Sequence, residues 1–305
     1  MKRTKIIIGS RGSKLALTQS QDVLHGLAKN CPEIKFDLKI IKTRGDKLQD
    51  VALAKIGSKG FFTKELEEAL LAKEIDVAVH SLKDLPVESP QGLAIGAITK
   101  RVDARDILAR NKSKLEPGDT IGTSSLRRQA QLRAWGKDFR IADLRGNLDT
   151  RLRKLKEGQF AAIVIALAGL KRLQIETAYE ILPIEMMMPA PGQGALAVQV
   201  RAGDDFVVDI VSKLNDQATA LAVIAERALL LSLGGGCQVP VGAYATINEN
   251  ILALKGLVIS LDGKKKVAGE IREALTKRSA ESIGQALAKN LLARGAGEIL
   301  CNIKK

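Results

Sequence analysis

The pattern of apolar and polar positions along the chain is of two simple kinds. Short stretches that are apolar throughout, such as 6–8, 77–79 and 161–165, are typical of strands buried on both faces of a sheet. Between them, apolar residues three and four positions apart indicate amphipathic helices. Strands that alternate with helices in this way predict parallel sheets covered by helices on both faces.

The first two-thirds of the chain hold two successive sets of such elements. Strands are expected over 5–9, 36–43, 75–80, 92–98, 118–123, 139–144 and 160–166. Helices are expected over 13–29, 63–74, 124–135 and 147–158. From about residue 217 the pattern predicts one strong helix over 218–233, then strands, and a final helix near 278–294.

The two sets resemble each other in sequence. In both, a strand leads through small polar residues into a helix, and VAVHSLKDL at 77–85 parallels IVIALAGLKRL at 163–173. Aligned on the shared Leu-Lys-x-Leu, Asp84 stands opposite Arg172. We therefore predict two similar doubly wound α/β domains, of the kind seen in periplasmic binding proteins, that flank a cleft, with a smaller C-terminal α+β domain. The expected domain boundaries are 1–99 with 195–213, 100–190, and 217–305.

Charge narrows the choice of ligand. The 305 residues include 48 lysines and arginines against 34 acidic residues, which gives a formal net charge of +14. Such an excess favours a polyanionic partner, and nucleic acid is the first candidate. Aromatic residues make up only 3% of the chain, however, so surfaces for stacking bases are scarce. Many arginines follow predicted strands beside glycine, serine or threonine, which favours a compact polyacid over nucleic acid.

Neither a membrane segment nor a metal site is expected. No apolar stretch is long enough to cross a bilayer, and only three apolar residues in a row follow the basic start, which predicts a cytoplasmic protein without a signal peptide. His25 and His80 are the only histidines, and the three cysteines form no C-x-x-C pair, so an ordinary zinc site is not expected. We expect the thiols to be reduced.

Cys237 lies in an unusual context, the turn-like stretch LGGGCQVPVG at 233–242. A free cysteine is often a small buried residue that only fills space. The glycines beside it offer no side chains to pack, yet they permit unusual backbone angles and the close approach of another molecule. From this stretch alone, packing and ligand attachment both remain open.

Six ordered motifs make the chain similar to a known family. They are VAVHSLKDLP (77–86), GTSSLRRQAQL (122–132), LRGNLDTRLRKL (144–155), AGLKRL (168–173), PAPGQGAL (189–196) and GGGCQVPVGAYA (234–245). In this order and spacing they resemble porphobilinogen deaminase, also called hydroxymethylbilane synthase, over nearly the whole chain. The resemblance implies a transferase of haem-type tetrapyrrole biosynthesis that deaminates porphobilinogen and joins four molecules head to tail into hydroxymethylbilane. It also implies a dipyrromethane cofactor that a thioether attaches to Cys237.

The resemblance further implies roles for individual residues. Asp84 would be the catalytic carboxylate, which stabilises positive charge on pyrrole nitrogens and helps ammonia to leave; its place before Pro86 leaves a turn residue as the alternative. Guanidinium groups suit the acetate and propionate that each pyrrole unit carries. The cofactor acids would be held by Ser81, Lys83, Thr123, Ser125, Arg127 and Arg128. Porphobilinogen and the growing chain would be bound by Arg11, Ser13, Arg145, Arg151 and Arg172.

A glycine-rich stretch at 54–66 lies between a predicted strand and a predicted helix. Lys55, Lys59 and Phe62 are candidates for a lid over the cleft, with the Phe62 ring stacking on a pyrrole. The sequence gives no signal for oligomers, and a monomer is expected. Two other function classes stand as alternatives: a cytoplasmic protein that binds or senses small anions, which needs no covalent anchor such as Cys237, and a basic nucleic-acid-binding protein.

Overall fold

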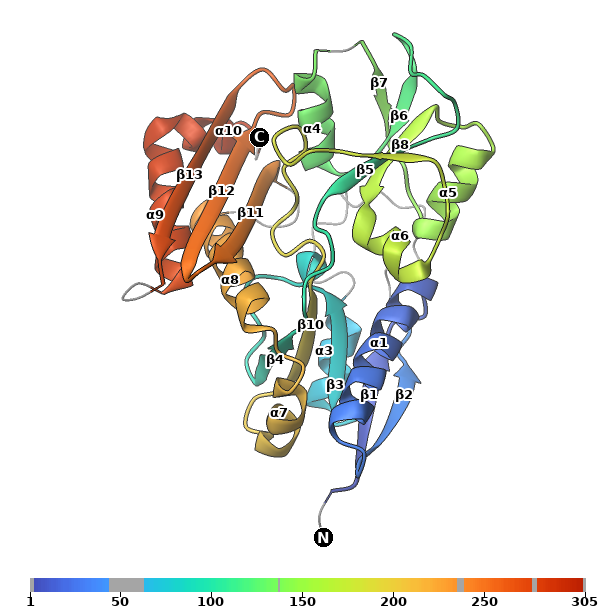
Figure 1. The fold of residues 1–305 in the computed structure, drawn as a ribbon, viewed down its shortest axis with the longest axis vertical. Coiled ribbons are helices and arrows are strands. Elements are labelled where there is room, and N and C mark those ends of the chain that lie inside the picture. Colours follow the sequence, from blue (N-terminus) through green and yellow to red (C-terminus); the bar gives the residue numbers. More distant parts are fainter. Residues whose placement is uncertain (1–2, 44–62, 137, 235–238, 276–278, 304–305) are drawn as a thin grey trace. The chain divides into compact units, whose positions relative to one another are not determined.

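The computed structural model describes residues 3–43, 63–136, 138–234, 239–275 and 279–303 (Figure 1). The chain forms two compact units. Unit 1 comprises 1–102 and 194–220, and unit 2 comprises 103–193 and 221–305. No helix among the described residues is long and apolar enough to cross a membrane.

Unit 1 is built on a five-stranded sheet in the order β2-β1-β3-β10-β4. Its strands are β1 (Lys5–Ser10), β2 (Lys35–Ile40), β3 (Val77–Ser81), β4 (Leu93–Ile98) and β10 (Leu196–Arg201). β1, β2 and β3 are parallel, whereas β10 runs antiparallel to both of its neighbours. Helices α1 (Lys14–Asn30) and α7 (Asp205–Ser212) pack with Ile6 and Ile8 in one hydrophobic cluster, and α3 (Lys64–Leu71) packs with Ala78 in another.

Unit 2 contains a second five-stranded sheet, in the order β7-β6-β8-β5-β9. Its strands are β5 (Asp106–Arg110), β6 (Thr120–Gly122), β7 (Arg140–Ala142), β8 (Ala162–Ala166) and β9 (Tyr179–Ile181). Leu132 of α4 (Leu126–Ala134) packs in one hydrophobic cluster of this sheet. Residues of α5 (Leu148–Lys156) and α6 (Leu167–Leu173) pack in a second cluster.

The two sheets share one topology, which confirms the expected pair of similar α/β domains. Strand for strand, the order and the directions agree: three parallel strands, then one antiparallel strand that also pairs antiparallel with the edge strand. Even a close packing contact is repeated. A Cβ on Gly9 of β1 would overlap the Ile75 side chain, and one on Gly122 of β6 would lie 2.7 Å from Phe160. Ile75 and Phe160 lie just before β3 and β8, the strands that pair with β1 and β6 in their sheets.

The alignment of the two Leu-Lys-x-Leu stretches predicted that Asp84 and Arg172 occupy equivalent positions in the two domains, and this prediction is wrong. The antiparallel strand pairs its first residue with Ser81 in unit 1 and with Ala166 in unit 2, so these two strand ends correspond. Asp84 closes the short 3-10 turn η1 (Leu82–Asp84) directly after its strand, whereas Arg172 lies in the last turn of the longer helix α6. The shared Leu-Lys-x-Leu letters therefore occupy different places in the two folds.

The C-terminal part of unit 2 contains an antiparallel sheet of three strands. This agrees with the smaller C-terminal α+β portion that the sequence predicted. The sheet contains β11 (Val241–Asn248), β12 (Ile251–Ile259) and β13 (Lys266–Ala274). Helices α8 (Gln217–Ser232) and α9 (Ala280–Leu291) share one hydrophobic cluster with this sheet, and the short α10 (Gly297–Cys301) ends the chain's helices (Figure 1). The predicted division of 100–190 from 217–305 as separate domains stays a prediction, since all but the first few residues of each stretch fall within unit 2.

Strand β12 and its hairpin also hold α4 in place. Leu257 and Ile259 share a hydrophobic cluster with Ala130 of α4 and with Met188. Gly263, at the hairpin, has a φ of +76°, and a Cβ there would lie 2.6 Å from the backbone nitrogen of Ala134. Because only glycine fits at this approach, the hairpin packs directly against the C-terminal end of α4.

A cluster of four charged side chains ties strands together in unit 1. Asp76 Oδ1 accepts from Arg3 and, at 2.8 Å, from Arg201 Nη2, while Oδ2 accepts from the backbone N–H of Ile7 at 2.8 Å. Asp204 accepts from Arg3 at 3.0 Å and from Arg201 at 2.8 Å. Burial opposes ionisation of Asp204, but these hydrogen bonds from arginine outweigh it, so its pKa lies below the usual value.

Gly284 decides how closely α9 approaches α8. A Cβ at this position would lie 2.8 Å from Ala228 Cβ and 2.9 Å from the backbone nitrogen of Leu229, and would press on the carbonyl of Ala225. We expect Gly284→Ala to lower the free energy of unfolding by about 1–3 kcal/mol, because backbone atoms cannot move aside, although alanine is the better helix former.

Gly297→Ala in α10 is the matched control, since the nearest atom to a Cβ there is Leu292 Cδ2 at 3.7 Å. Calorimetric unfolding of both variants checks the prediction. Equal midpoints for Gly284→Ala and the unsubstituted protein would contradict it.

Candidate functional site

In unit 1, the carboxyl ends of β1 and β3 lie at one edge of the sheet because these strands are adjacent and parallel. Ser13 is the N-cap of α1, and its Oγ accepts from the backbone N–H of Ala16 at 3.3 Å. β10 begins at the same edge, where the N–H of Leu82 donates to the carbonyl of Ala195 at 3.0 Å. The structure thus brings to this edge Arg11, Ser13, Ser81, Lys83 and Asp84.

Asp84 is exposed at the end of η1. Its turn is closed by the backbone, where the N–H of Leu85 donates to the carbonyl of Leu82 at 3.2 Å. Among the described residues, the Asp84 carboxylate has no hydrogen-bond or ion-pair partner. It is therefore available to a ligand, and it does not stabilise the turn through its side chain.

Ser81, by contrast, has a partner that the sequence did not reveal. Its Oγ lies 2.9 Å from Nε2 and 3.2 Å from Oε1 of Gln19, a residue of α1 that is only 5% exposed. A glutamine in an amphipathic pattern looks like part of the solvent-facing side, so nothing in the sequence distinguished it. Gln19 fixes the hydroxyl of Ser81 at the strand end.

His80 is buried in a chain of hydrogen bonds behind this edge. Its Nε2 lies 3.0 Å from Gln199 Oε1, and Gln199 Nε2 donates to Glu67 Oε1 at 3.3 Å. Burial lowers the pKa of His80 to about 4, an effect that the positive charge of Arg11 increases and the hydrogen bond to Gln199 opposes. Burial also raises the pKa of Glu67. The imidazole is therefore neutral near pH 7, and Nε2 carries its proton.

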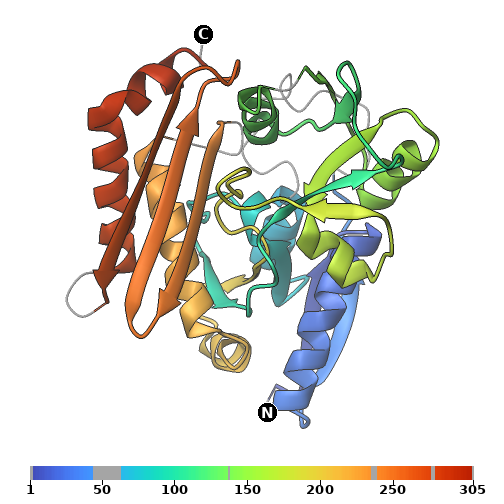
Figure 2. The same ribbon diagram turned by 45° about the horizontal axis from the view of Figure 1, so that its top comes forward.

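In unit 2, the corresponding edge is formed by the carboxyl ends of β6, β7 and β8 and the start of β5 (Figure 1, Figure 2). Helices α4, α5 and α6 follow β6, β7 and β8 in turn, and they carry or adjoin the predicted residues. These helices and the segments that lead into them contain Thr123, Ser125, Arg127, Arg128, Arg145, Arg151 and Arg172. The motifs predicted that Thr123, Ser125, Arg127 and Arg128 hold the cofactor and that Arg145, Arg151 and Arg172 bind substrate.

Arg127 and Arg128, in the first turn of α4, are each only 5% exposed, and both bind the fully buried Asp106. Arg127 Nη2 donates to Oδ2 at 2.9 Å and Arg128 Nη2 to Oδ1 at 2.7 Å. Burial lowers the pKa of Arg127. The carboxylate of Asp106 opposes this shift, whereas the like charge of Arg128 lowers the pKa further. Two guanidiniums and one carboxylate leave one positive charge without a counter-ion among the three groups, so a further carboxylate is favoured here.

Arg128 Nε provides a test of whether a carboxylate ligand fits. This nitrogen is buried and has no hydrogen-bond partner among the residues that the structure describes. A buried donor without a partner is uncommon in native proteins and is unfavourable. A carboxylated group that accepts from Arg128 would remove this deficit, so the residues present fit an acidic cofactor.

The other predicted residues of unit 2 differ in exposure and partners. Thr123 is 2% exposed, and its Oγ1 accepts from the backbone N–H of Ser125 at 3.4 Å. Arg145 Nη2 lies 3.6 Å from Asp143 Oδ2. Arg151 Nε donates to the carbonyl of Gly146 at 2.8 Å, and Arg172 is half-buried in α6.

Four predicted residues lie outside the described part of the chain: Cys237, Lys55, Lys59 and Phe62. The other two cysteines are described. Cys31 is buried, with Lys213 Nζ at 3.1 Å from its sulfur, and Cys301 is exposed in α10. Across the described ranges, no group of histidine, cysteine, aspartate and glutamate side chains could hold a metal ion.

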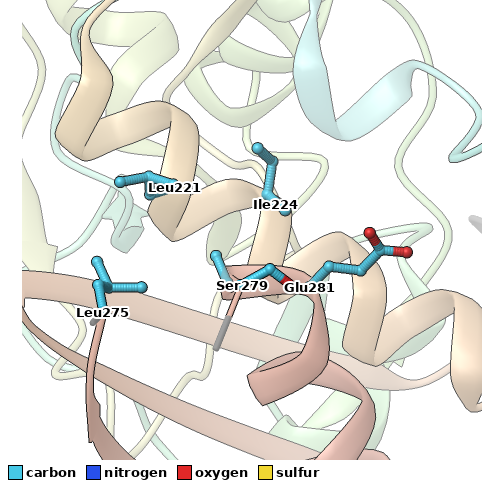
Figure 3. Close-up of a pocket in the computed structure, with 6 residues that line it drawn as sticks. Leu221, Ile224, Leu275, Ser279 and Glu281 are labelled. Carbon is cyan, nitrogen blue, oxygen red and sulfur yellow. The ribbon is translucent and has the colours of Figure 1, made fainter. Parts of the chain in front are cut away.

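A pocket of about 360 Å³ lies between α8 and α9 in unit 2 (Figure 3). Its lining is formed by Leu221, Ile224, Leu275, Ser279, Ala280 and Glu281. No predicted site residue contributes to it. Because the lining is mostly apolar and its one charge is a carboxylate, this pocket does not suit an acidic ligand.

Comparisons with known proteins agree with the motifs. The family model "Porphobilinogen deaminase, dipyromethane cofactor binding domain" matches residues 6–209, and "Porphobilinogen deaminase, C-terminal domain" matches residues 220–293. The porphobilinogen deaminase of Syntrophomonas wolfei is 47% identical over 303 residues, or 98% of each chain. That of Brevibacillus brevis is 48% identical over 302 residues, or 97% of this chain and 96% of the relative.

Among solved structures, the substrate binding domain 2 of Lactococcus lactis GlnP resembles the chain with a TM-score of 0.42. The two are 13% identical, and the match covers 70% of this chain and 88% of that one. A likeness of this size does not indicate a shared function.

The buried imidazole gives a pH-dependent prediction. An unfolded histidine has a pKa of about 6.5, so the unfolded chain takes up a proton before folded His80 does at about 4. Stability from this group is therefore complete above about pH 6.5 and declines as the pH falls towards about 4. We expect the His80 ring resonances in NMR spectra to stay unchanged from about pH 8 to about pH 5.

The His80 resonances are identified by their absence from spectra of the variant His80→Gln. As the pH falls from about 6.5 to about 4, the free energy of unfolding of this variant should decrease less than that of the unsubstituted protein. A ring that titrates near neutral pH would show that His80 is not desolvated as described.

Proposed function

The chain belongs to the porphobilinogen deaminase family, and on this basis we propose that it releases ammonia from four porphobilinogen molecules and joins them head to tail into hydroxymethylbilane. It is a transferase of tetrapyrrole biosynthesis with a dipyrromethane cofactor. The observation that carries this function is the full-length match to the family. Purified protein incubated with porphobilinogen tests it, by ammonia release and by the mass of the linear product.

For the cofactor, we propose Cys237 as the point of attachment. A thiolate is a strong nucleophile towards the electrophilic methylene that porphobilinogen bears once ammonia has left, and the resulting thioether resists hydrolysis. The dipyrromethane supplies the pyrrole carbon from which the product is extended. Its acids would be held by Ser81, Lys83, Thr123, Ser125, Arg127 and Arg128. The unpartnered Nε of Arg128 supports this assignment.

For catalysis, we propose Asp84. Its carboxylate is exposed and has no partner among the described residues. Deamination and ring coupling both place positive charge on a pyrrole nitrogen, and a fixed carboxylate beside that N–H stabilises the charge more in the transition state than before it. The same carboxylate can pass a proton towards the leaving amine. Substrate acids would be bound by Arg11, Ser13, Arg145, Arg151 and Arg172.

We further propose a cytoplasmic monomer whose partner is porphobilinogen, without nucleic acid or membrane partners. Lys55, Lys59 and Phe62 remain our proposal for a lid over the substrate. The excess of basic residues is explained by a ligand that gains two carboxylates with every unit added, so it does not require nucleic acid. Light scattering of the purified protein checks the oligomeric state.

One prediction from the proposed function concerns the attachment point. Cys237→Ser should fold but carry no added mass, because a serine hydroxyl is a far weaker nucleophile than a thiolate. Intact mass spectrometry of the purified variant measures this directly. The controls are Cys31→Ser and Cys301→Ser, which should retain the cofactor mass. Loss of that mass in either control would identify a different thiol as the anchor.

Another prediction from the proposed function concerns Asp84. Asp84→Asn preserves shape and removes the charge, so we expect ammonia release in a single turnover to slow by about a hundredfold to a thousandfold. The cofactor mass should persist. Asp84→Glu keeps the charge but moves it, and should lose less activity. If Asp84→Asn released ammonia as fast as the unsubstituted enzyme, Asp84 would be a turn residue only.

A further inference from the structure

Asp106 controls how Arg127 and Arg128 are oriented. Each guanidinium is held at two points, the second being a backbone carbonyl: Arg127 Nη1 donates to Met188 O at 2.6 Å, and Arg128 Nη1 to Val164 O at 3.1 Å. Since the guanidinium is planar, two fixed points set the directions of its remaining N–H groups. Within the described part of the chain, Asp106 is the one partner that the two guanidiniums share.

Gln193 connects this carboxylate to the rest of unit 2. Its Nε2 donates to Asp106 Oδ1 at 2.8 Å and to the carbonyl of Ala104 at 2.7 Å. Gln193 is 1% exposed, and its position in the motif PAPGQGAL gave no sign of a buried partner. The side chain fixes the segment around residue 193 to the start of β5.

Glu226 of α8 continues the connection. Its Oε2 accepts from the N–H of Gly192 at 2.7 Å, and its Oε1 from the N–H of Ala245 in β11 at 2.7 Å. Helix α8 ends at Ser232 and β11 begins at Val241, on either side of Cys237 in the chain. One buried network therefore joins the arginine pair to both elements that flank the cysteine.

We propose that Asp106 is a positioning residue for cofactor acquisition, which orients the guanidiniums of Arg127 and Arg128 towards the incoming carboxylates. Gln193 and Glu226 act with it, by holding α8 and β11 to the same buried centre. This inference rests on the proposed function, because it assigns to Asp106 a step that only a deaminase with a covalent cofactor performs. Asp106 itself touches neither cofactor nor substrate in this proposal.

The test follows cofactor uptake directly. Full-length apoprotein, made in a host that cannot synthesise porphobilinogen, is incubated with porphobilinogen, and the added mass is followed over time. Asp106→Asn keeps the shape but leaves two buried cations without their counter-ion. We expect it to gain the cofactor mass at least about tenfold more slowly than the unsubstituted chain, since small misplacement of binding groups reduces rates strongly.

Asp76→Asn is the matched control. Asp76 is also a buried carboxylate, 7% exposed, that accepts from two arginine side chains, but it lies in unit 1 away from the predicted residues. Both variants should unfold at lower temperature, so uptake is measured below both midpoints. We expect Asp76→Asn to acquire the cofactor at the unsubstituted rate.

Uptake by Asp106→Asn at the unsubstituted rate, or equal slowing in Asp76→Asn, would overturn the proposal and leave Asp106 a structural counter-ion. If Asp106→Asn fails to fold, the variant Gln193→Leu takes its place, because it removes one hydrogen bond to Asp106 and keeps both ion pairs. Gln193→Leu should slow cofactor uptake several-fold, and an unchanged rate would overturn the proposal. An unsubstituted chain that gains no mass would instead refute the proposed function.

Discussion

Two guanidinium groups buried side by side are the constraint on which the architecture of unit 2 depends. Arg127 and Arg128 are adjacent in sequence and each 5% exposed, so their repulsion and their loss of hydration must be offset within the fold. Asp106 offsets them because β5 runs antiparallel to β8 and so begins at the edge where β6 ends. Helix α4 must also stay fixed, and β12 with its hairpin packs against it.

The same sheet topology serves different chemistry in the two units. The residue that begins the antiparallel strand is Asp106 in unit 2 and Leu196 in unit 1. Unit 2 therefore buries a carboxylate beneath two cations, which leaves positive charge for acidic groups. Unit 1 keeps an apolar residue at that position and presents an exposed carboxylate, Asp84, in the turn after β3. The same sheet topology thus buries a carboxylate at the start of the antiparallel strand in unit 2 and exposes one in the turn after β3 in unit 1.

The sequence predicted both α/β sheets, helix α4 and the edge at which the motif residues gather, because buried strands and helix starts leave local patterns. It did not predict β5, whose stretch DILAR begins with an aspartate and so reads as a loop. The cations that neutralise Asp106 lie 21 and 22 residues away, and no local pattern encodes such a pairing. Gln19 was missed for the same reason, since its partner Ser81 lies 62 residues away.

Arginine at positions 127 and 128 follows from this geometry, and lysine would not satisfy it. Each guanidinium contacts Asp106 with one terminal nitrogen and a backbone carbonyl with the other, whereas an ammonium has one nitrogen on a flexible stem. Burial lowers the pKa of Arg127. A lysine, which starts roughly two units lower, would be brought closer to neutrality by the same desolvation. Because the buried centre must remain charged before any acidic group arrives, it requires a cation that does not lose its proton.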